Sequence, residues 1–388
     1  MPSSATVLVN ARGEQRVRLG HLWVYRSDVV DVQAQGGDCV KVLGPRGRVI
    51  GGALYSDRSQ IALRFLSRSD RPADVVLIRA RLQQAVSYRK RLAIDATAYR
   101  LVHAEGDMLP SLIVDRYGEH LVVQALSQGM DRLLPDITAM LVEMLSPLGV
   151  LARNDPRVRE LEGLARTVDV LHGEVPQRVS VREGPIEYEV DLRHGQKTGL
   201  FLDQRENREA AARYASGRLL DCFTYDGGFA LRLARQCEQV EAIDSADDAV
   251  LRVSANAARN GLNLEVRTAN VFDELRRLER AGERYDTIVL DPPAFARNKG
   301  ALEGAFAGYK EINLRAMRLL RPGGTLVTCS CSYHMQESLF GEMLHEAAID
   351  SHATLALVEK RLQARDHPVL IGVPETSYLK CFILRRME

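Results

Sequence analysis

The sequence predicts an α/β protein whose C-terminal half is a parallel sheet covered by helices, and three observations predict it. The chain has 388 residues, of which 46% are hydrophobic and 27% charged, the balance of folded globular proteins. From Leu219 onward, short β-rich runs alternate with helical segments, as in βαβ units. The first seventy or so residues hold only short β-rich runs separated by glycine-rich turns.

The length allows two or three domains. We expect a small all-β module over residues 1–70, a basic helix with a compact α+β domain over 71–183, and the α/β domain over 184–388. The strands expected in the first module cover residues 5–10, 21–33, 39–45, 48–56 and 61–67. After Pro72, the apolar residues return at helical spacing (Val75, Ile78, Leu82 and Val86), which predicts a basic amphipathic helix.

In the α/β domain, the expected strands cover residues 218–223, 240–244, 264–269, 285–293 and 325–332. The expected helices between them cover residues 227–237, 246–261, 271–281 and 310–320, and a Pro322-Gly323-Gly324 turn precedes the last strand. In such parallel sheets, ligands bind beyond the carboxyl ends of the strands. The last residues of each strand are therefore the candidates for a functional site.

The composition excludes several classes of protein. No run of eighteen apolar residues and no signal-peptide pattern occurs, so we expect a cytoplasmic protein without a membrane partner. The six cysteines are scattered and form no C-x-x-C pair, so neither a disulfide framework nor a zinc or other metal site is expected.

The net charge of +1 hides an uneven distribution along the chain. Residues 1–100 contain 17 lysines and arginines against 8 acidic residues, a net +9, so the remaining residues carry −8. A basic N-terminal region of this kind is typical of contact with nucleic acid. Arginines that are merely solvated would give the same count, and charge alone leaves both interpretations open.

The first two strands of the expected sheet end in residues suited to binding a nucleoside. Gly227-Gly228 follows the first strand but is not part of a G-x-G-x-x-G sequence, which disfavours a dinucleotide. Tight packing of strand against helix is the alternative, and for two glycines taken alone it is the favoured one. Asp244 ends the second strand, where a carboxylate can accept hydrogen bonds from ribose hydroxyls. Asn270 follows the third strand and could reach an adenine edge or cap a helix.

The fourth and fifth strands end in the residues with the most specific chemistry. In Asp291-Pro292-Pro293-Ala294-Phe295, the prolines stiffen the chain, the carboxylate could contact an amino-bearing heterocycle, and the phenylalanine could stack on it. A turn that simply leaves the sheet is the alternative. In the fifth strand, alternation places Cys329 and Cys331 on one face. A cysteine in a strand is usually a small apolar residue, but Cys331 lies nearer the expected pocket.

These motifs together resemble a known family. The runs DCFTYDGGFAL, AIDSADDAV, LDPPAFARNK and TCSCSYHM resemble a class I S-adenosylmethionine-dependent methyltransferase domain, and in particular the bacterial 23S ribosomal RNA cytosine-C5 methyltransferases of the large-subunit type. GHLWVYRSDV resembles the start of that family's PUA domain, an RNA-binding β-barrel, and EGDMLPSLIVDRYGEHLVVQ resembles its central domain. HGQKTGLFLDQRENR resembles the segment that leads into the methyltransferase sheet, so the resemblance covers the whole chain.

The resemblance implies S-adenosylmethionine as cofactor, 23S ribosomal RNA as substrate and 5-methylcytosine as product. Cys331 would be the catalytic nucleophile that adds to cytosine C6, and Asp291 would hold the N3/N4 edge of the base. The cofactor site would be formed by Phe201, Asp203, Phe223, Tyr225, Gly227, Gly228, Asp244, Asn270 and Asp291.

This sequence departs from the family at two positions. Asp226 stands where the family often has threonine, and Asn270 where it often has aspartate, so cofactor contacts at these two positions are less certain. Some RNA cytosine-C5 enzymes have a second cysteine in the Asp-Pro-Pro region for product release, where this chain has Ala294. Another group or water would then serve that step.

Two other functions compete with this interpretation. A methyltransferase of the same superfamily acting on a guanine or adenine nitrogen needs no thiol, and Ser330-Cys331-Ser332 favours cytosine over it. A noncatalytic RNA-binding protein of ribosome assembly could retain the same fold, and Asp226 and Asn270 are the only hints of it. For the oligomeric state, the sequence is compatible with a homodimer as well as with a monomer.

Overall fold

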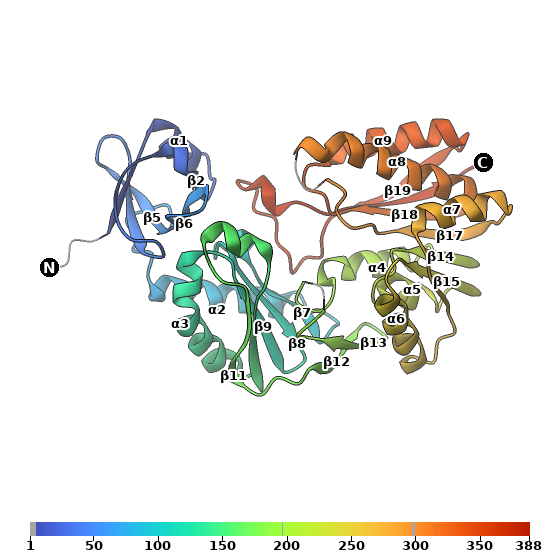
Figure 1. The fold of residues 1–388 in the computed structure, drawn as a ribbon, viewed down its shortest axis with the longest axis horizontal. Coiled ribbons are helices and arrows are strands. Elements are labelled where there is room, and N and C mark those ends of the chain that lie inside the picture. The colour runs from blue at the N-terminus through green and yellow to red at the C-terminus, as the bar shows by residue number, and fades with distance from the viewer. Residues whose placement is uncertain (1–4, 196, 297–298) are drawn as a thin grey trace. The chain divides into compact units, whose positions relative to one another are not determined.

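The computed structural model describes residues 5–195, 197–296 and 299–388 (Figure 1). Its chain divides into two compact units. The first comprises residues up to 181 together with 189–202 and 365–376, and the second comprises 182–188, 203–364 and 377–388. Gln196, Arg297 and Asn298 of the quoted motifs lie outside the described residues. In the part of the chain that is described, no helix has both the length and the hydropathy that crossing a membrane requires.

A six-stranded sheet opens the first unit. Its strands are β1 (Thr6–Val9), β2 (Trp23–Tyr25), β3 (Val29–Gln33), β4 (Cys39–Leu43), β5 (Val49–Tyr55) and β6 (Ile61–Ser67), in the order β2-β6-β5-β4-β1-β3. Alternate side chains such as Val7, Val42, Leu63 and Phe65 are completely buried in one cluster. Each β-rich run expected in this module contains a strand. A strand places alternate side chains on one face, and that face can be buried.

The expectation of a module made only of strands is wrong in one respect, because α1 (Ala11–Arg18) follows β1. The Asn10 side chain caps this helix by accepting a hydrogen bond from the Gly13 amide at 2.9 Å. Val17 on its inner face is buried. Residues 26–28 also form a 3-10 turn that divides the expected 21–33 strand into β2 and β3.

A five-stranded sheet with two helices forms the rest of the first unit. The elements are α2 (Val75–Arg91), β7 (Ala98–His103), β8 (Leu112–Tyr117), β9 (His120–Ala125), α3 (Gln128–Leu145), β10 (Gly149–Asn154) and β11 (Thr167–Gly173), with sheet order β11-β10-β9-β8-β7. On α2, Ile78, Leu82 and Val86 are buried as expected, whereas Val75 is 41% exposed. Asp74 caps the start of this helix, so Val75 lies in its first turn at the surface. β12 (Arg178–Glu183) and β13 (Ile186–Asp191) form a two-stranded sheet.

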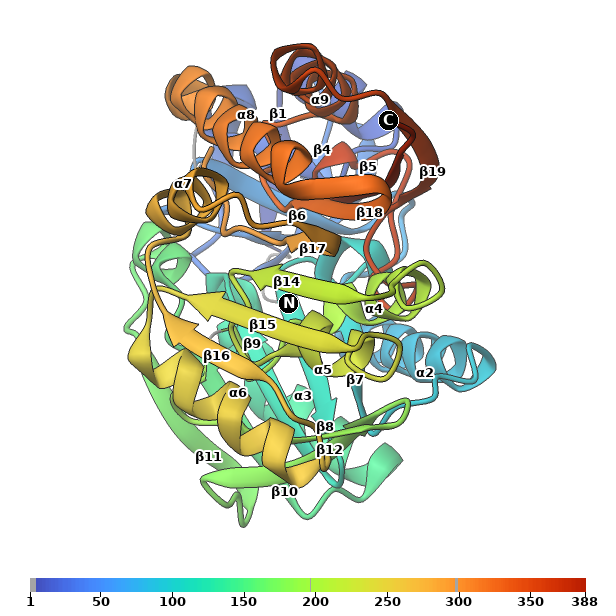
Figure 2. The same ribbon diagram turned by 90° about the vertical axis from the view of Figure 1, so that its right-hand side faces the viewer.

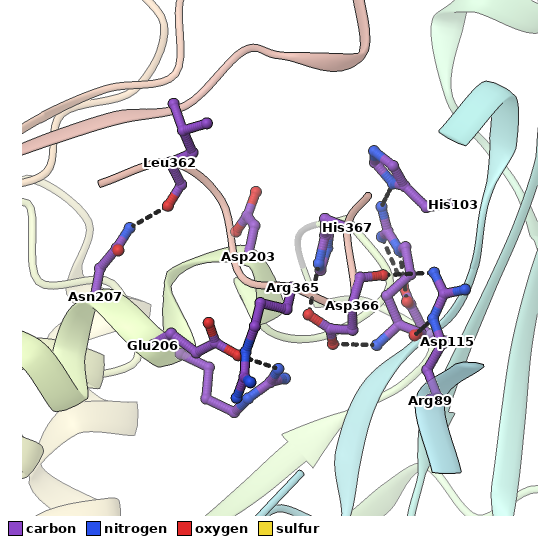
Figure 3. A network of polar contacts seen from close by, with 12 residues as sticks. Arg89, His103, Asp115, Asp203, Glu206, Asn207, Leu362, Arg365, Asp366 and His367 are labelled. Carbon is purple, nitrogen blue, oxygen red and sulfur yellow. Dashed lines mark hydrogen bonds and ion pairs between the residues drawn. The ribbon is translucent and has the colours of Figure 1, made fainter. Parts of the chain in front are cut away.

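Residues 365–376, although distant in sequence, are held in the first unit by a buried polar network (Figure 3). The Arg89 guanidinium donates to the main-chain oxygen of Asp366 at 2.6 Å and pairs with Asp107. The Arg100 amide donates to the Asp366 carboxylate at 2.9 Å, and His367 contacts the same carboxylate at 3.0 Å. Because buried polar groups need partners, these bonds fix the segment in place.

The second unit is built on a seven-stranded sheet. Its strands are β14 (Arg218–Cys222), β15 (Gln239–Asp244), β16 (Glu265–Thr268), β17 (Tyr285–Leu290), β18 (Leu320–Ser330), β19 (Leu355–Arg361) and β20 (Lys380–Arg386), in the order β16-β15-β14-β17-β18-β20-β19. The first five pair in parallel, as the sequence predicts, and β20 runs antiparallel to both its neighbours. β15 and β17 lie on opposite sides of β14, so the strand order reverses at β14. Open α/β sheets bind ligands at such a point.

In the described part of the chain, helices cover both faces of this sheet (Figure 2). α4 (Arg205–Ala211), α5 (Gly228–Leu233) and α6 (Asp247–Arg259) pack on one face, and α7 (Val271–Arg280), α8 (Leu302–Leu319) and α9 (Glu337–Ser351) pack on the other. α8 is longer than the 310–320 helix expected. α9, β19 and β20 lie beyond the last strand assigned from sequence.

Candidate functional site

The turn after β14 is braced by a buried carboxylate. Asp221 accepts hydrogen bonds from the Thr224 hydroxyl at 2.7 Å and the Ala230 amide at 3.0 Å. Burial raises the pKa of Asp221 to about 7, and Asp291 and Asp244 add to the rise. Phe223 and Tyr225 adopt left-handed backbone angles, with φ of 63° and 50°. Asp221 was predicted only as part of a strand, although an acidic residue at the end of a buried strand was an available signal of its bracing role.

The two glycines of this turn fit closely against neighbouring side chains. Gly227 has a φ of +82°, and a Cβ on Gly228 would lie 2.7 Å from an Arg208 guanidinium nitrogen. Glu183 holds that guanidinium with two hydrogen bonds of 2.7 Å. Tight packing, the alternative open from sequence, is therefore a sufficient reason for Gly228.

Asp244 joins the ends of the first two strands. Its Oδ2 accepts a hydrogen bond from the Tyr225 amide and its Oδ1 one from the Ala246 amide, both at 3.0 Å. The carboxylate is half-buried. Each carboxylate oxygen has about two acceptor sites, so each can take a further bond from a hydroxyl group. The geometry at Asp244 thus fits a ribose with two neighbouring hydroxyls.

Asp226, one of the departures from the family, forms an ion pair that supports the turn. Its Oδ1 accepts from Arg252 Nε at 2.6 Å, and the Arg252 guanidinium lies 4.9 Å from the centre of the Tyr225 ring. Burial raises the pKa of Asp226 to about 6, against the opposing effect of Arg252. Arg252 therefore holds both Asp226 and Tyr225.

Asn270 is the N-cap of α7. Its Oδ1 accepts hydrogen bonds from the Phe272 amide at 3.0 Å and the Asp273 amide at 3.3 Å. The residue is exposed. Asn270 therefore has the capping role that the sequence allowed. Because the cap uses Oδ1, a contact between Asn270 and adenine would have to use the amide nitrogen.

Asp291, directly after β17, is held by a short chain of amide side chains. Gln204 Nε2 donates to Asp291 Oδ1 at 2.8 Å, and Asn207 donates to Gln204 Oε1 at 2.7 Å. Asn207 is fixed in turn by Leu362 and Arg361, and its bond to Leu362 is drawn in Figure 3. Gln204 was not identified from sequence, although it lies within the quoted HGQKTGLFLDQRENR run.

Phe295 belongs to an aromatic cluster. Its ring centre lies 4.7 Å from that of Tyr309, 5.9 Å from that of Phe272 and 6.4 Å from that of Phe223. These contacts account for the packing of the Asp-Pro-Pro loop against α7 and α8.

The two neighbouring cysteines occupy different environments. Cys329 lies in β18 opposite Cys381 of β20, is completely buried, and has its pKa raised well above the ordinary value, chiefly by that burial. β18 ends at Ser330, so strand alternation does not determine the direction of Cys331. The Cys331 thiol is half-buried and lies 3.9 Å from the main-chain oxygen of Pro292. The thiol therefore adjoins the residue that follows Asp291.

The two site candidates that precede the sheet lie in different units. Phe201 belongs to the first unit, where the Lys197 ammonium lies 4.3 Å from its ring centre. Asp203 belongs to the second unit and is buried there. Its Oδ2 accepts a hydrogen bond from the Tyr378 hydroxyl at 2.7 Å.

Comparison with known families supports both the sheet and the N-terminal module. Residues 164–385 match the model of an S-adenosylmethionine-dependent methyltransferase, and residues 7–68 match that of a PUA-like domain. A structure from Streptococcus mutans assigned as a SAM-dependent methyltransferase has a TM-score of 0.83 at 21% identity, with 98% of this chain and 99% of that chain covered. SMU.776, solved as a complex with SAH, has a TM-score of 0.85 at 21% identity and the same coverage. These likenesses confirm the fold.

Curated relatives match over nearly the full length. Ribosomal RNA large subunit methyltransferase I of Tolumonas auensis is 38% identical, covering 98% of this chain and 99% of the relative. The protein of that name from Shewanella amazonensis is 39% identical, with 94% and 95% covered. The chain therefore belongs to the S-adenosylmethionine-dependent methyltransferase family, which uses S-adenosylmethionine as its cofactor, and its full-length relatives are named ribosomal RNA large subunit methyltransferase I.

Proposed function

We propose that this protein methylates C5 of a cytosine in 23S ribosomal RNA through a covalent bond between Cys331 and C6 of the base. The observation that carries the proposal is the 3.9 Å separation between the Cys331 thiol and the Pro292 oxygen, next to Asp291. A guanine or adenine nitrogen can attack a methyl donor directly, whereas C5 of cytosine is not nucleophilic until a nucleophile adds to C6. The names of the full-length relatives support ribosomal RNA of the large subunit as substrate.

In this reaction the Cys331 thiolate adds its electron pair to C6, and the electrons of the C5–C6 double bond shift so that C5 becomes enamine-like. Bound S-adenosylmethionine supplies a methyl group made electrophilic by its positively charged sulfur. C5 takes this methyl group as the bond between the methyl carbon and the donor's sulfur breaks, leaving the electron pair of that bond on the sulfur. A base then removes the C5 proton, the double bond reforms, and the S–C6 bond breaks with its electron pair returning to Cys331.

Asp291 is proposed to hold the N3/N4 edge of the cytosine. Its carboxylate can accept a hydrogen bond from the N4 amino group, and in its protonated form it can donate one to N3, where negative charge develops when the thiolate adds to C6. The bond from Gln204 fixes one oxygen of this carboxylate before the base arrives. Such preorganisation matters because a carboxylate free to rotate would have to be ordered in each catalytic cycle.

The cofactor is proposed to lie over the carboxyl ends of β14 and β15, with Asp244 on the ribose hydroxyls. Fixed acceptors at this strand end support the assignment. The remaining residues proposed to contact the cofactor are Phe201, Asp203, Phe223, Tyr225, Gly227, Gly228, Asn270 and Asp291.

The rest of the chain is proposed to bring RNA to this site. We assign residues 1–70 to RNA binding, 71–183 to the basic helix and central domain, and 184–388 to methyl transfer; the +9 charge of residues 1–100 and the PUA-like match support this division. A cytoplasmic location follows from the proposed substrate. For the homodimer, light scattering on the purified protein distinguishes two copies from one.

The test is mass-spectrometric mapping of modified nucleosides in 23S ribosomal RNA from a strain that lacks this gene. One 5-methylcytosine should disappear, return with the wild-type gene, and stay absent with Cys331→Ala. Loss of a methylguanine or methyladenine instead would support the nitrogen methyltransferase. If no nucleoside changes and calorimetry detects no binding of S-adenosylmethionine, the noncatalytic alternative would be correct.

A further inference from the structure

Lys380 is a buried lysine at the start of β20, next to the strand that leads to Cys331. It is 6% exposed and pairs with Ser330 across the sheet. Its Nζ donates hydrogen bonds to the main-chain oxygen of Ser332 at 2.6 Å and to that of Tyr378 at 2.7 Å. Lys380 therefore holds the residue directly after the cysteine, and its charge lies beside that segment.

A buried ammonium needs compensation, because transferring a charge out of water is costly. Main-chain oxygens offer only partial negative charge. Burial lowers the pKa of Lys380 to about 8, and the charges of Cys331 and Glu337 oppose this effect. Glu337 forms its own ion pair with Lys360 at 2.8 Å. At neutral pH most Lys380 side chains are still protonated.

We propose that Lys380 is the cationic partner that stabilises the Cys331 thiolate and so prepares the nucleophile of the reaction proposed above. The inference rests on that reaction for its purpose, but the pairing of the two groups can be measured without RNA. Lys380 acts through Cys331 and is a positioning residue, because it is not expected to touch the base.

Before the reaction, the Cys331 thiol releases its proton to solvent and becomes a thiolate beside the Lys380 ammonium. When sulfur bonds to C6, its negative charge moves to the cytosine ring. When the S–C6 bond breaks, the electron pair returns to sulfur and the ion pair with Lys380 reforms, so the lysine keeps its proton throughout.

Tyr309 and Glu337 also lie near this pair. Tyr309 of α8 bonds Ser330 and Ser332 through its hydroxyl at 3.1 and 3.0 Å. Burial and the charge of Cys331 raise its pKa, so it stays neutral. From α9, Glu337 is the acidic group acting on Lys380. Asp291, in the loop after β17, is a further titratable side chain near the thiol, because Cys331 lies 3.9 Å from the main-chain oxygen of the adjacent Pro292.

The test is the pH dependence of Cys331 alkylation by iodoacetamide, measured peptide by peptide with mass spectrometry. In wild type, Cys331 should ionise below the ordinary thiol pKa of about 8.5. Lys380→Met should raise its pKa by about one unit or more, the effect of removing a nearby opposite charge, and slow alkylation at neutral pH about tenfold. Lys380→Arg should retain much of the low pKa. Lys310→Met, which removes an ion-paired lysine of α8, should change nothing.

A wild-type Cys331 pKa at or above about 8.5 would overturn the inference, and this measurement needs no variant to fold. An unchanged pKa in a folded Lys380→Met protein would overturn it too. Trapping on 5-fluorocytosine RNA separates this result from the proposed function. If Lys380→Met shifts the Cys331 pKa but the wild-type protein forms no RNA adduct, the ion pair is supported and the cytosine reaction is rejected. If the wild-type protein forms the adduct but the Cys331 pKa does not shift, the cytosine reaction is supported and the ion pair is rejected.

Discussion

Gln204 Nε2 donates a 2.8 Å hydrogen bond to Asp291 Oδ1, and this bond connects the segment before the sheet to the carboxyl end of β17. Gln204 is buried, and its own oxygen accepts from Asn207. The amide cannot rotate without breaking one of the two bonds. The orientation of the Asp291 carboxylate is therefore determined by residues that were not recognised from sequence.

Replacing Gln204 by leucine should lower kcat about tenfold, because a bond to a charged acceptor contributes about 1.5 to 3 kcal/mol and only part of it is specific to the reaction. The affinity for S-adenosylmethionine should change little. Methyl transfer to RNA under saturating cofactor measures the effect. Gln236→Leu, at an exposed position after α5, is the matched control. Equal kcat values for both variants would contradict a positioning role.

Replacing Asp244 by alanine should weaken S-adenosylmethionine binding ten- to a hundredfold, since about 1.5 to 3 kcal/mol of charged hydrogen bonding is lost. Calorimetry gives the affinity directly. Asp248→Ala removes an exposed carboxylate of α6 and should leave binding unchanged. Wild-type affinity in Asp244→Ala would remove the ribose assignment.

Asp221 should make the protein less stable as the pH rises. Burial raises its pKa to about 7 in the folded state, so the folded protein keeps a proton that the unfolded chain releases above about pH 4. Stability from this group is thus fully present below about pH 4 and is lost up to about pH 7, by at most about 4 kcal/mol. Asp221→Asn cannot ionise, so its melting temperature relative to wild type should increase between about pH 5 and pH 8. A constant difference would show that Asp221 titrates normally.

The exposed turn between β4 and β5 should contribute to RNA binding. If Arg46 and Arg48 each contact a phosphate, replacing both by glutamine should reduce the slope of log affinity against log salt by about 1.4 to 1.8. The control replaces Arg280 and Arg284, two exposed arginines of the second unit, and removes the same charge. Equal slopes in the two double variants would place the RNA contacts elsewhere.

The sheet and its strand-end residues could be predicted because they follow from local patterns. Asp244 and Asp291 end buried apolar runs, and parallel strands bring their carboxyl ends to one edge. The order of the strands around β14 and the antiparallel β20 could not be read in this way, because pairing depends on contacts between residues far apart in sequence.

The helix α1 and the position of Lys380 were not predicted from sequence. α1 was missed because an eight-residue helix between strands gives a weak periodic signal, although Asn10 is a good cap. Lys380 opens β20 directly before the buried apolar run Cys381–Leu384, and a lysine adjoining such a run was the available signal. Its proximity to Ser332 comes from the pairing of β18 with β20, which the sequence does not reveal.

The measurement that tests the central claim most directly is covalent trapping of Cys331 on RNA that carries 5-fluorocytosine at the target position. With fluorine at C5 there is no proton to remove, so elimination fails and the protein stays bonded to the base. We predict that wild type and Cys329→Ala form the trapped complex in the presence of S-adenosylmethionine, and that Cys331→Ala binds the cofactor but forms none. A complex that persists in Cys331→Ala and disappears in Cys329→Ala would contradict the account.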